Sequence, residues 1–170
     1  MRTLIFTIIL TFWAGTLFAG GMDEPASISP AFEKMKSMAG TWNGTTDDSG
    51  KVSINYQVVS SGSAVMEMLN VAQDSATMIT MYHMNGKNLM MTHYCSAGNQ
   101  PRMKADGAMK DPNKLAFTFV DATNLAGPKD GYMKKLVLTF KDADHFTEEW
   151  TFSKDGVMGH PKVFNFERVK

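Results

Sequence analysis

A histidine and a cysteine, His93 and Cys95, stand two residues apart in the segment Leu89–Cys95. Histidine is a common metal ligand and general base, and a cysteine thiolate is a nucleophile. On a strand the two share one face at a backbone spacing of roughly 6–7 Å, which is poor for direct proton transfer. No further histidine or carboxylate stands at ligand spacing from them. We therefore expect no metal site and no catalytic pair here, and we interpret His93 as a packed or ligand-lining residue.

Glu148 is the second candidate, because it interrupts an alternating apolar run that contains Phe146 and Trp150. A three-residue turn at 142–144 directs all three side chains to one inner face, since residues two apart on a strand share a face. The same register predicts that Arg168, near the end of the chain, lies beside or diagonal to Glu148. A buried carboxyl group without a partner is costly or becomes neutral. We therefore expect a Glu148–Arg168 pair, which either closes the fold or anchors a ligand.

Fifteen methionines are many for 170 residues, and thioether ligands select Cu(I). Copper sites of that kind gather methionines in short tracts. Here they follow the spacing of core positions, as do Met66, Met68, Met78 and Met81. We interpret them as adaptable core residues, which would also suit a cavity for apolar ligands, and we expect no cofactor.

Period-two alternation begins at Thr41, and the run from Val52 to Val58 is typical of a half-buried strand. Turn signals rich in Gly, Pro, Asn and Asp recur at short intervals along the remaining chain. Many short strands joined by hairpins favour an up-and-down antiparallel β-barrel of about ten strands, because closing the sheet removes its edges. The fold class is therefore all-β.

One short helix precedes the strands. Ser29 is a good N-cap and Pro30 suits the first helical position. Apolar residues at helical spacing predict a helix over 32–39 that Gly40 ends, and we expect it to pack at one end of the barrel.

The Asn85–Gly86 pair predicts a tight hairpin, either with a two-residue turn or with a longer turn and a bulge at Gly86. The bulged form would give the strands on either side a shared inner face, made up of Ile79, Met81, Leu89 and Met91, followed by His93 and Cys95.

The first 19 residues have the three-part build of an export signal: Arg2, an apolar run over 4–13, and small residues over 14–19. The run is too short to span a bilayer of about 30 Å as a helix. We expect a signal peptide over 1–19, a mature N-terminus at Gly20, a flexible tail over 20–28 and one domain over 29–170. The protein would then be periplasmic or secreted, with no stable membrane insertion after cleavage. The alternative is an uncleaved anchor.

Charge and cysteine content exclude other classes. The chain has 17 basic and 17 acidic residues with no basic segment, which argues against nucleic acid as a partner. The single cysteine cannot close an internal disulfide. Nothing in the sequence indicates an oligomeric state.

At Ala39–Trp42 the chain resembles the lipocalin (calycin) signature, a short helix followed by Gly-x-Trp at the first strand. The resemblance implies that Trp42 closes one barrel end and that Arg168 packs across it. The segments 81–83, 89–95, 98–103 and 117–125 also resemble an uncharacterised group of bacterial exported lipocalin-like proteins. The plan is broadly similar to nitrobindin-type haem barrels, but neither His145 nor His160 matches their axial histidine.

These observations predict non-enzymatic binding of a small, largely apolar molecule inside the barrel. Candidate ligand-binding residues are Trp42, Tyr56, His93, Arg102, Glu148, Trp150 and Arg168. Arg102 either meets an anionic group at the barrel mouth or is simply solvated. The alternatives are an enzyme that uses Glu148 or His93 as an acid or base, and a ligand-free structural or stress-related envelope protein.

Overall fold

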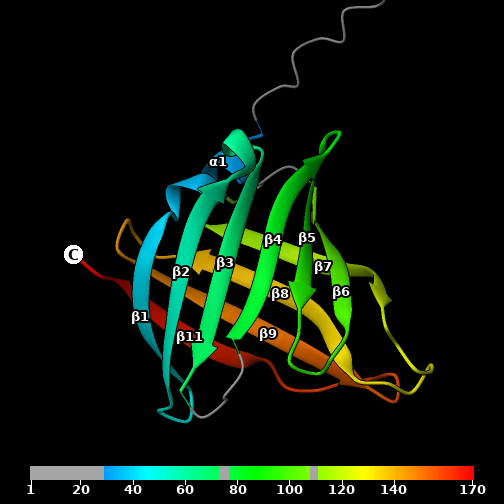
Figure 1. Cartoon of the computed structure of the whole chain (residues 1–170). Helices are drawn as coiled ribbons and strands as arrows, with labels where there is room; N and C mark the ends of the chain where they lie inside the picture. Colours follow the sequence, from blue (N-terminus) through cyan, green and yellow to red (C-terminus); the bar gives the residue numbers. More distant parts are fainter. Residues whose placement is uncertain (1–28, 73–76, 108–110) are drawn as a thin grey trace, which may run out of the picture.

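The computed structural model describes residues 29–72, 77–107 and 111–170. The signal peptide and the tail predicted for residues 1–28 lie outside the described residues. The described chain folds as a closed antiparallel β-barrel with one short helix at one end (Figure 1). The predicted all-β barrel of about ten strands is therefore confirmed.

Period-two alternation of buried and exposed side chains runs along most strands, as in β2, where Val52, Ile54 and Tyr56 are buried. The strands are β1 (Gly40–Thr46), β2 (Lys51–Val59), β3 (Ala64–Val71), β4 (Thr77–Asn85), β5 (Asn88–Tyr94), β6 (Gln100–Ala105), β7 (Lys114–Thr123), β8 (Tyr132–Phe140), β9 (His145–Lys154), β10 (Val157–Met158) and β11 (Lys162–Arg168). A short 3-10 turn, Ser60–Gly62, joins β2 to β3.

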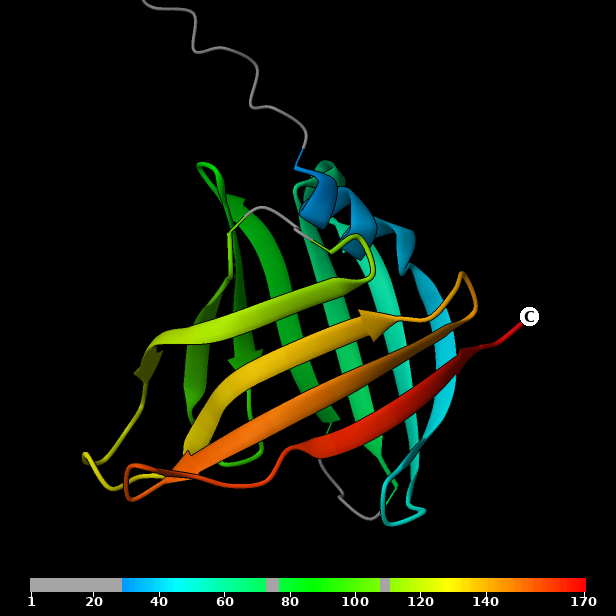
Figure 2. The ribbon, with the colours of Figure 1, turned by 180° about the vertical axis from the view of Figure 1, so that it is seen from behind.

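Consecutive strands pair from β1 to β9, and β11 closes the barrel by pairing with both β9 and β1. The two-residue strand β10 pairs only with β9 and extends that hairpin. Ten strands therefore form the barrel wall, and each has a neighbour on both sides. In Figure 2, β7, β8, β9 and β11 form the front wall of the barrel and run at a steep angle to β2–β4, which form the wall behind them.

The helix α1 (Pro30–Ser37) covers the end of the barrel where β1 begins (Figures 1 and 2). The Ser29 hydroxyl accepts a hydrogen bond from the Phe32 amide, and Pro30 occupies the first turn, as predicted. The helix ends at Ser37, two residues before the predicted end. We call this the helix end of the barrel and the opposite one the far end.

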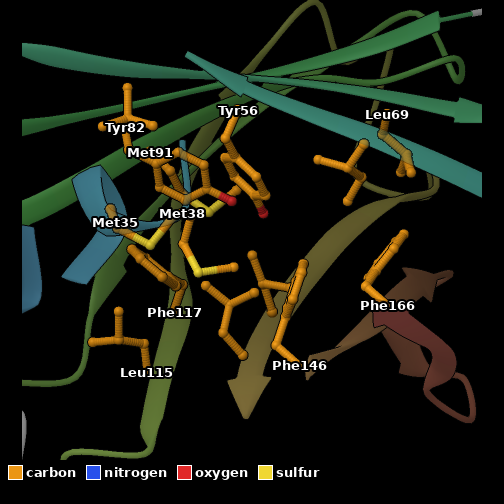
Figure 3. Close-up of a cluster of buried hydrophobic side chains, with 14 of the residues drawn as sticks. Met35, Met38, Tyr56, Leu69, Tyr82, Met91, Leu115, Phe117, Phe146 and Phe166 are labelled. Carbon is orange, nitrogen blue, oxygen red and sulfur yellow. The ribbon is translucent and has the colours of Figure 1, made fainter. Parts of the chain in front are cut away.

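Apolar side chains from every wall fill the interior next to the helix (Figure 3). Met35 of α1 and Met38, which follows the helix, extend into the interior, where they lie with Phe117 of β7 and Phe146 of β9. The Phe146 ring contacts the Trp42 ring edge-on at a centroid distance of 4.8 Å. This core fixes the strands that carry the polar interior described below.

The β4–β5 hairpin differs from the bulged form considered above. Asn85 pairs with Asn88, so the two-residue turn is Gly86–Lys87, with Gly86 at a φ of +56°. Tyr82 therefore lies opposite Met91 on the inner face, whereas Ile79 and Met81 lie on the other face and are half-buried.

Strand β3 corrects a second prediction. Val65, Glu67 and Leu69 are its buried inner residues, and Met66 and Met68 are half-buried on the opposite face. Of the four methionines expected at core positions, only Met78 is buried.

Candidate functional site

A row of four polar side chains crosses one wall of the barrel interior. Tyr56 on β2 lies opposite Glu67 on β3, Glu67 lies opposite Thr80 on β4, and Thr80 lies opposite His93 on β5. Each of the four side chains is at most 1% exposed. Glu148 and Trp150 reach the row from the facing strand β9. We call these six residues, together with Tyr82, the polar belt.

Glu67 has three hydrogen-bonding hydroxyl groups around its carboxyl group, although it is fully buried. The Tyr82 hydroxyl lies 2.6 Å from Oε2, the Tyr56 hydroxyl lies 3.1 Å from the same oxygen, and the Thr80 hydroxyl lies 3.2 Å from Oε1. Figure 3 shows the side chains of Tyr56 and Tyr82 pointing into the same interior region. Protein hydroxyl groups thus replace the water that a buried carboxyl group has lost.

Glu148 points inward as predicted. On the neighbouring strand β8, Leu138 lies opposite Glu148, and Leu136 lies opposite Trp150. The Trp150 indole N–H donates to Oε2 at 2.9 Å, and the Tyr56 hydroxyl lies 2.7 Å from Oε1.

The predicted Glu148–Arg168 pair is wrong. The residue of β11 opposite Glu148 is Phe164, and Arg168 stands four residues further along. Four residues of strand span roughly 13 Å, so the guanidinium group lies near the helix end and cannot reach Glu148.

Tyr56 links the two carboxyl groups, and its single proton limits how they are charged. One hydroxyl group donates one hydrogen bond, yet its oxygen lies within hydrogen-bond distance of both Glu67 and Glu148. Both contacts are hydrogen bonds only if one carboxyl group is protonated and donates to the Tyr56 oxygen. Glu67 has three hydroxyl neighbours and is the better site for the negative charge, so Glu148 is the neutral acid.

Burial governs the ionisation of the belt. Desolvation raises the pKa of Glu67 to about 7, against the opposing effect of its hydrogen bonds from Tyr82, Tyr56 and Thr80. Desolvation, and then the charge of Glu67, raise the pKa of Glu148 well above its usual value. Desolvation lowers the pKa of His93 to about 4. The directions agree with a neutral Glu148, a neutral His93 and a Glu67 that ionises first.

His93 connects the row to the facing wall. Its Nδ1 lies 3.0 Å from the Thr80 hydroxyl, and its ring packs on Trp150 at a centroid distance of 4.5 Å. Its Nε2 is buried and has no hydrogen-bond partner. Cys95, expected on the same inner face, instead follows the end of β5 and is half-exposed in the turn, so the two do not form a pair.

Trp42 and Arg168 lie at the helix end, away from the belt. Trp42 is 1% exposed and donates from Nε1 to the Met38 carbonyl at 2.9 Å. The Arg168 guanidinium carbon lies 4.0 Å from the centre of the Trp42 ring and also donates to the carbonyls of Ala39 and Ser37. The packing that the lipocalin-like signature implies is therefore present.

Arg102 lies on the outer surface of β6, where its guanidinium group donates to both carboxylate oxygens of Asp121 on β7. Both side chains are about half exposed. The seven predicted site residues thus separate into three groups: Tyr56, His93, Glu148 and Trp150 in the belt, Trp42 and Arg168 at the helix end, and Arg102 outside.

Hollows of small-molecule size indent the described surface at two places of interest. One of about 580 Å³ lies at the far end, where the segments that follow β5 and β7 meet the end of β9, and Asn99, Gly131 and Phe152 are among its lining residues. We call it the far-end hollow. A second of about 850 Å³ lies on the outer face of β1, β2 and β11. The belt residues line neither of these two hollows.

Asn99 is a buried polar residue that lines the far-end hollow. Its side chain is 3% exposed, and its Nδ2 donates to the Gly131 carbonyl at 2.8 Å, while its Oδ1 has no partner. His93 Nε2 and Asn99 Oδ1 are the buried side-chain polar atoms of the described residues that lack a hydrogen bond. They come from the end of β5 and from the turn that follows it.

Within the ranges that the structure covers, no group of three or more His, Cys, Asp or Glu side chains is placed to hold a metal ion. None of the helices described there is long and apolar enough to cross a membrane.

Sequence reasoning missed Glu67, Thr80, Tyr82 and Asn99. Glu67 stands between Met66 and Met68. Because side chains alternate between the two faces of a strand, the two methionines were predicted to point inward and Glu67 outward. The feature that could have placed Glu67 inward is the second apolar series of this strand, Val65, Leu69 and Val71, which lies on the same face as Glu67.

No protein-family model matches the chain, and no curated protein matches it. The crystal structure of a protein of unknown function from the DUF3598 family of Nostoc punctiforme PCC 73102 is similar over 79% of this chain, at 11% identity and a TM-score of 0.53. The chain spans about half of that protein, 49% of its length. The structure of EF1p2_mFAP2b bound to DFHBI aligns with 82% of this chain and 98% of its own, at 9% identity and a TM-score of 0.34.

The first similarity shows a shared fold and nothing more, and the second is too slight to add to it. The closed barrel with a helix at one end fits a lipocalin-like plan.

Proposed function

We propose that this protein is a small-molecule binding barrel that holds its ligand at the far end. The apolar body of the ligand would lie against Phe152, and its polar groups would face Asn99 and His93. The observation that carries the proposal is a pair of buried polar atoms without a hydrogen-bond partner: Asn99 Oδ1, on a residue that lines this hollow, and His93 Nε2, near the end of the strand β5 that leads to it. Buried polar groups in proteins nearly always have partners, so a ligand that pairs with them would complete the site.

The far-end hollow supports this place for the ligand. Its volume of about 580 Å³ falls within the range of small-molecule sites, roughly 300–1,000 Å³. Phe152 gives it an aromatic wall, and the ring of Phe152 lies directly over Gly131, where a side chain would collide with it. The apolar wall beside a few fixed polar groups is the usual make-up of such sites.

Binding fits the belt better than catalysis does. Glu67 and Glu148 are fully buried, and their carboxyl oxygens are held by hydroxyl and indole groups. A substrate would have to displace those groups to exchange a proton with either acid. The pKa of His93, about 4 because of burial, makes it a weak base at neutral pH.

Native mass spectrometry of the folded protein as purified tests the proposal, followed by titration with 1-anilinonaphthalene-8-sulfonate as a defined probe. Ala126 and Ala72 are exposed alanines that line the far-end hollow and the outer hollow, respectively. Ala126→Trp should abolish the retained small molecule and weaken probe binding. Ala72→Trp, the matched control, should leave both unchanged. Absence of binding in the wild type, or a loss confined to Ala72→Trp, would contradict the proposal.

We propose further that the protein acts outside the cytoplasm, after removal of residues 1–19, and that it belongs to the exported lipocalin-like group that the sequence resembles. The basis is the export signal in the sequence together with the barrel. Intact-mass analysis of the exported form should give a chain that starts at Gly20, and a membrane-bound species that starts at Met1 would refute this part.

A further inference from the structure

The hydrogen bonds of the belt form one continuous chain from Glu148 through Tyr56, Glu67 and Thr80 to His93. Two of its links, Tyr56 and Thr80, are single hydroxyl groups. Each hydroxyl group can donate only once, so each must donate to one neighbour and accept from the other. The direction of every bond is therefore coupled to the protonation of the two carboxyl groups.

With the charge on Glu67, the chain has one consistent arrangement. The Glu148 acid donates to the Tyr56 oxygen, and Tyr56 donates to Glu67. Thr80 also donates to Glu67, so its oxygen must accept from His93. Only a proton on Nδ1 can make that bond. The imidazole of His93 is neutral, so its Nε2 carries a lone pair and no proton.

We infer that the ligand extends from the far-end hollow into the barrel interior and donates a hydrogen bond to His93 Nε2 from a neutral O–H or N–H group, such as that of a phenol, an alcohol or an amide. This inference rests on the proposed function, since it specifies the chemistry of the same ligand. A donor is required because Nε2 is an acceptor. The donor is neutral because the negative charge of Glu67 repels an anion, and because burying a cation beside the 1% exposed His93 would remove its hydration.

The charge of Glu67 excludes an anionic ligand. None of the ion pairs in the described ranges involves Glu67 or Glu148, so hydroxyl groups alone stabilise the negative charge. A second negative charge on the ligand near His93 would be repelled through a medium of low dielectric constant. A neutral donor avoids this repulsion and still satisfies Nε2. The pKa of Glu67, about 7, puts much of the population in the charged form under neutral conditions.

The tautomer of His93 is measured directly by long-range 15N–1H NMR, with the resonance assigned by its absence in His93→Phe. At a pH above the pKa of Glu67, the wild type should carry the proton on Nδ1. Thr80→Val removes the acceptor hydroxyl with little change of shape and should reduce the Nδ1–H population. Thr80→Ser keeps the hydroxyl and should retain it. A wild-type proton on Nε2, or an unchanged tautomer in Thr80→Val, would overturn the inference.

The ligand class is tested with three probes of similar size: phenol, anisole and benzoate. Phenol has a neutral donor, anisole lacks the donor, and benzoate is an anion. Calorimetric titration of the wild type should show phenol binding about tenfold more tightly than anisole, which is the contribution of one hydrogen bond to a buried acceptor. Benzoate should bind more weakly than phenol. In His93→Phe, phenol and anisole should bind alike.

The outcomes separate this inference from the proposed function. Equal binding of phenol and anisole to the wild type overturns the donor requirement, while loss of the retained molecule in Ala126→Trp would still support ligand binding. Tighter binding of benzoate than of phenol also overturns the inference. Absence of a retained molecule and of any probe binding in the wild type would overturn the proposed function, whereas the NMR result would still decide the tautomer.

Discussion

The guanidinium group of Arg168 lies over the indole ring of Trp42, with 4.0 Å between the guanidinium carbon and the ring centroid. The same group donates to the carbonyl oxygens of Ala39 at 2.9 Å and of Ser37 at 3.1 Å. The last barrel strand is thereby fastened both to the first strand and to the end of α1. Gly40 makes room for this contact, since it has a φ of +128° and a side chain there would approach the guanidinium group.

Arg168→Met should lower the free energy of unfolding by about 1–3 kcal/mol. It removes a cation–π contact worth about 0.5–2 kcal/mol and charged hydrogen bonds to carbonyl groups of the helix segment. Arg102→Met is the matched control, because its ion pair with Asp121 is exposed and should contribute less than about 1 kcal/mol. Urea denaturation of both variants measures the difference. Equal losses would show that Arg168 does not fasten the helix end.

Glu148 and Arg168 should be energetically independent. In a double-mutant cycle, Glu148→Gln and Arg168→Met should add within about 0.5 kcal/mol, because the two side chains share no contact. Tyr56→Phe and Glu148→Gln should instead couple by more than about 0.5 kcal/mol, since the Tyr56 hydroxyl lies 2.7 Å from the Glu148 carboxyl group. Coupling in the first cycle would contradict the register of β11 against β9, and no coupling in the second would contradict the contact between Tyr56 and Glu148.

The stability of the protein should respond to pH through Glu67 and His93 in opposite senses. Glu67 has a pKa of about 7 in the folded protein, against an ordinary value of 4.5 for a solvated glutamate. The folded state therefore holds this proton more tightly, and stability falls as pH rises between those values. His93 has a pKa of about 4 in the folded protein, against an ordinary value of 6.5 for a solvated histidine. The unfolded state then binds the extra proton, and stability rises over that window.

Glu67→Gln should remove the contribution of Glu67 to the fall, a difference of about 3 kcal/mol relative to wild type across the interval from pH 4.5 to 7 at about 1.4 kcal/mol per pH unit. The contribution of Glu148, whose pKa is also raised by burial, has the same sign and remains. His93→Phe should make the fall steeper, because the opposing rise is lost. Chemical denaturation at a series of pH values provides the measurement. Glu167→Gln, an exposed change on the outer face, should reproduce the wild-type curve. A curve for Glu67→Gln that parallels the wild type would mean that Glu67 is not buried as described.

Gly44→Ala should destabilise the protein by about 1–3 kcal/mol through overpacking. A Cβ atom at Gly44 would collide with the backbone oxygen of Asn165 and would lie 2.6 Å from Cδ1 of Phe166 on β11. Gly127→Ala is the control, because a Cβ atom there meets nothing within 4 Å. Thermal melting of the two variants compares them, and a Gly44→Ala protein as stable as Gly127→Ala would show that β1 and β11 are less closely packed.

The sequence predicted the β8–β9 hairpin correctly, because a short polar turn fixes the register and only one face of the run from Phe146 to Trp150 is strongly apolar. The inward position of Glu148 followed from that register. The partner of Glu148 could not be predicted in the same way, because Tyr56 is 92 residues away in the sequence. Such a contact across the barrel depends on how the sheet closes, which local patterns do not specify.

Strands β3 and β4 were misassigned because methionine makes both of their faces apolar. Met66 and Met68 alternate with Val65 and Leu69, so hydrophobicity alone does not distinguish the inner face. In the β4–β5 hairpin, the position of the turn at Gly86–Lys87 determines which face of β4 is the inner one, since a shift of one residue exchanges the two faces of the strand. The inward position of Glu67, at the centre of the candidate site, could not be predicted for this reason.

Cys95 is the single cysteine of the chain, and it is half-exposed in the turn that also carries Asn99. A maleimide reagent will therefore couple to one defined position beside the far-end hollow, with no need to remove other thiols. An environment-sensitive fluorophore or a nitroxide attached there would report on occupancy of the hollow in real time. The native sequence thus already contains the attachment point for a reporter with which a library of compounds can be screened.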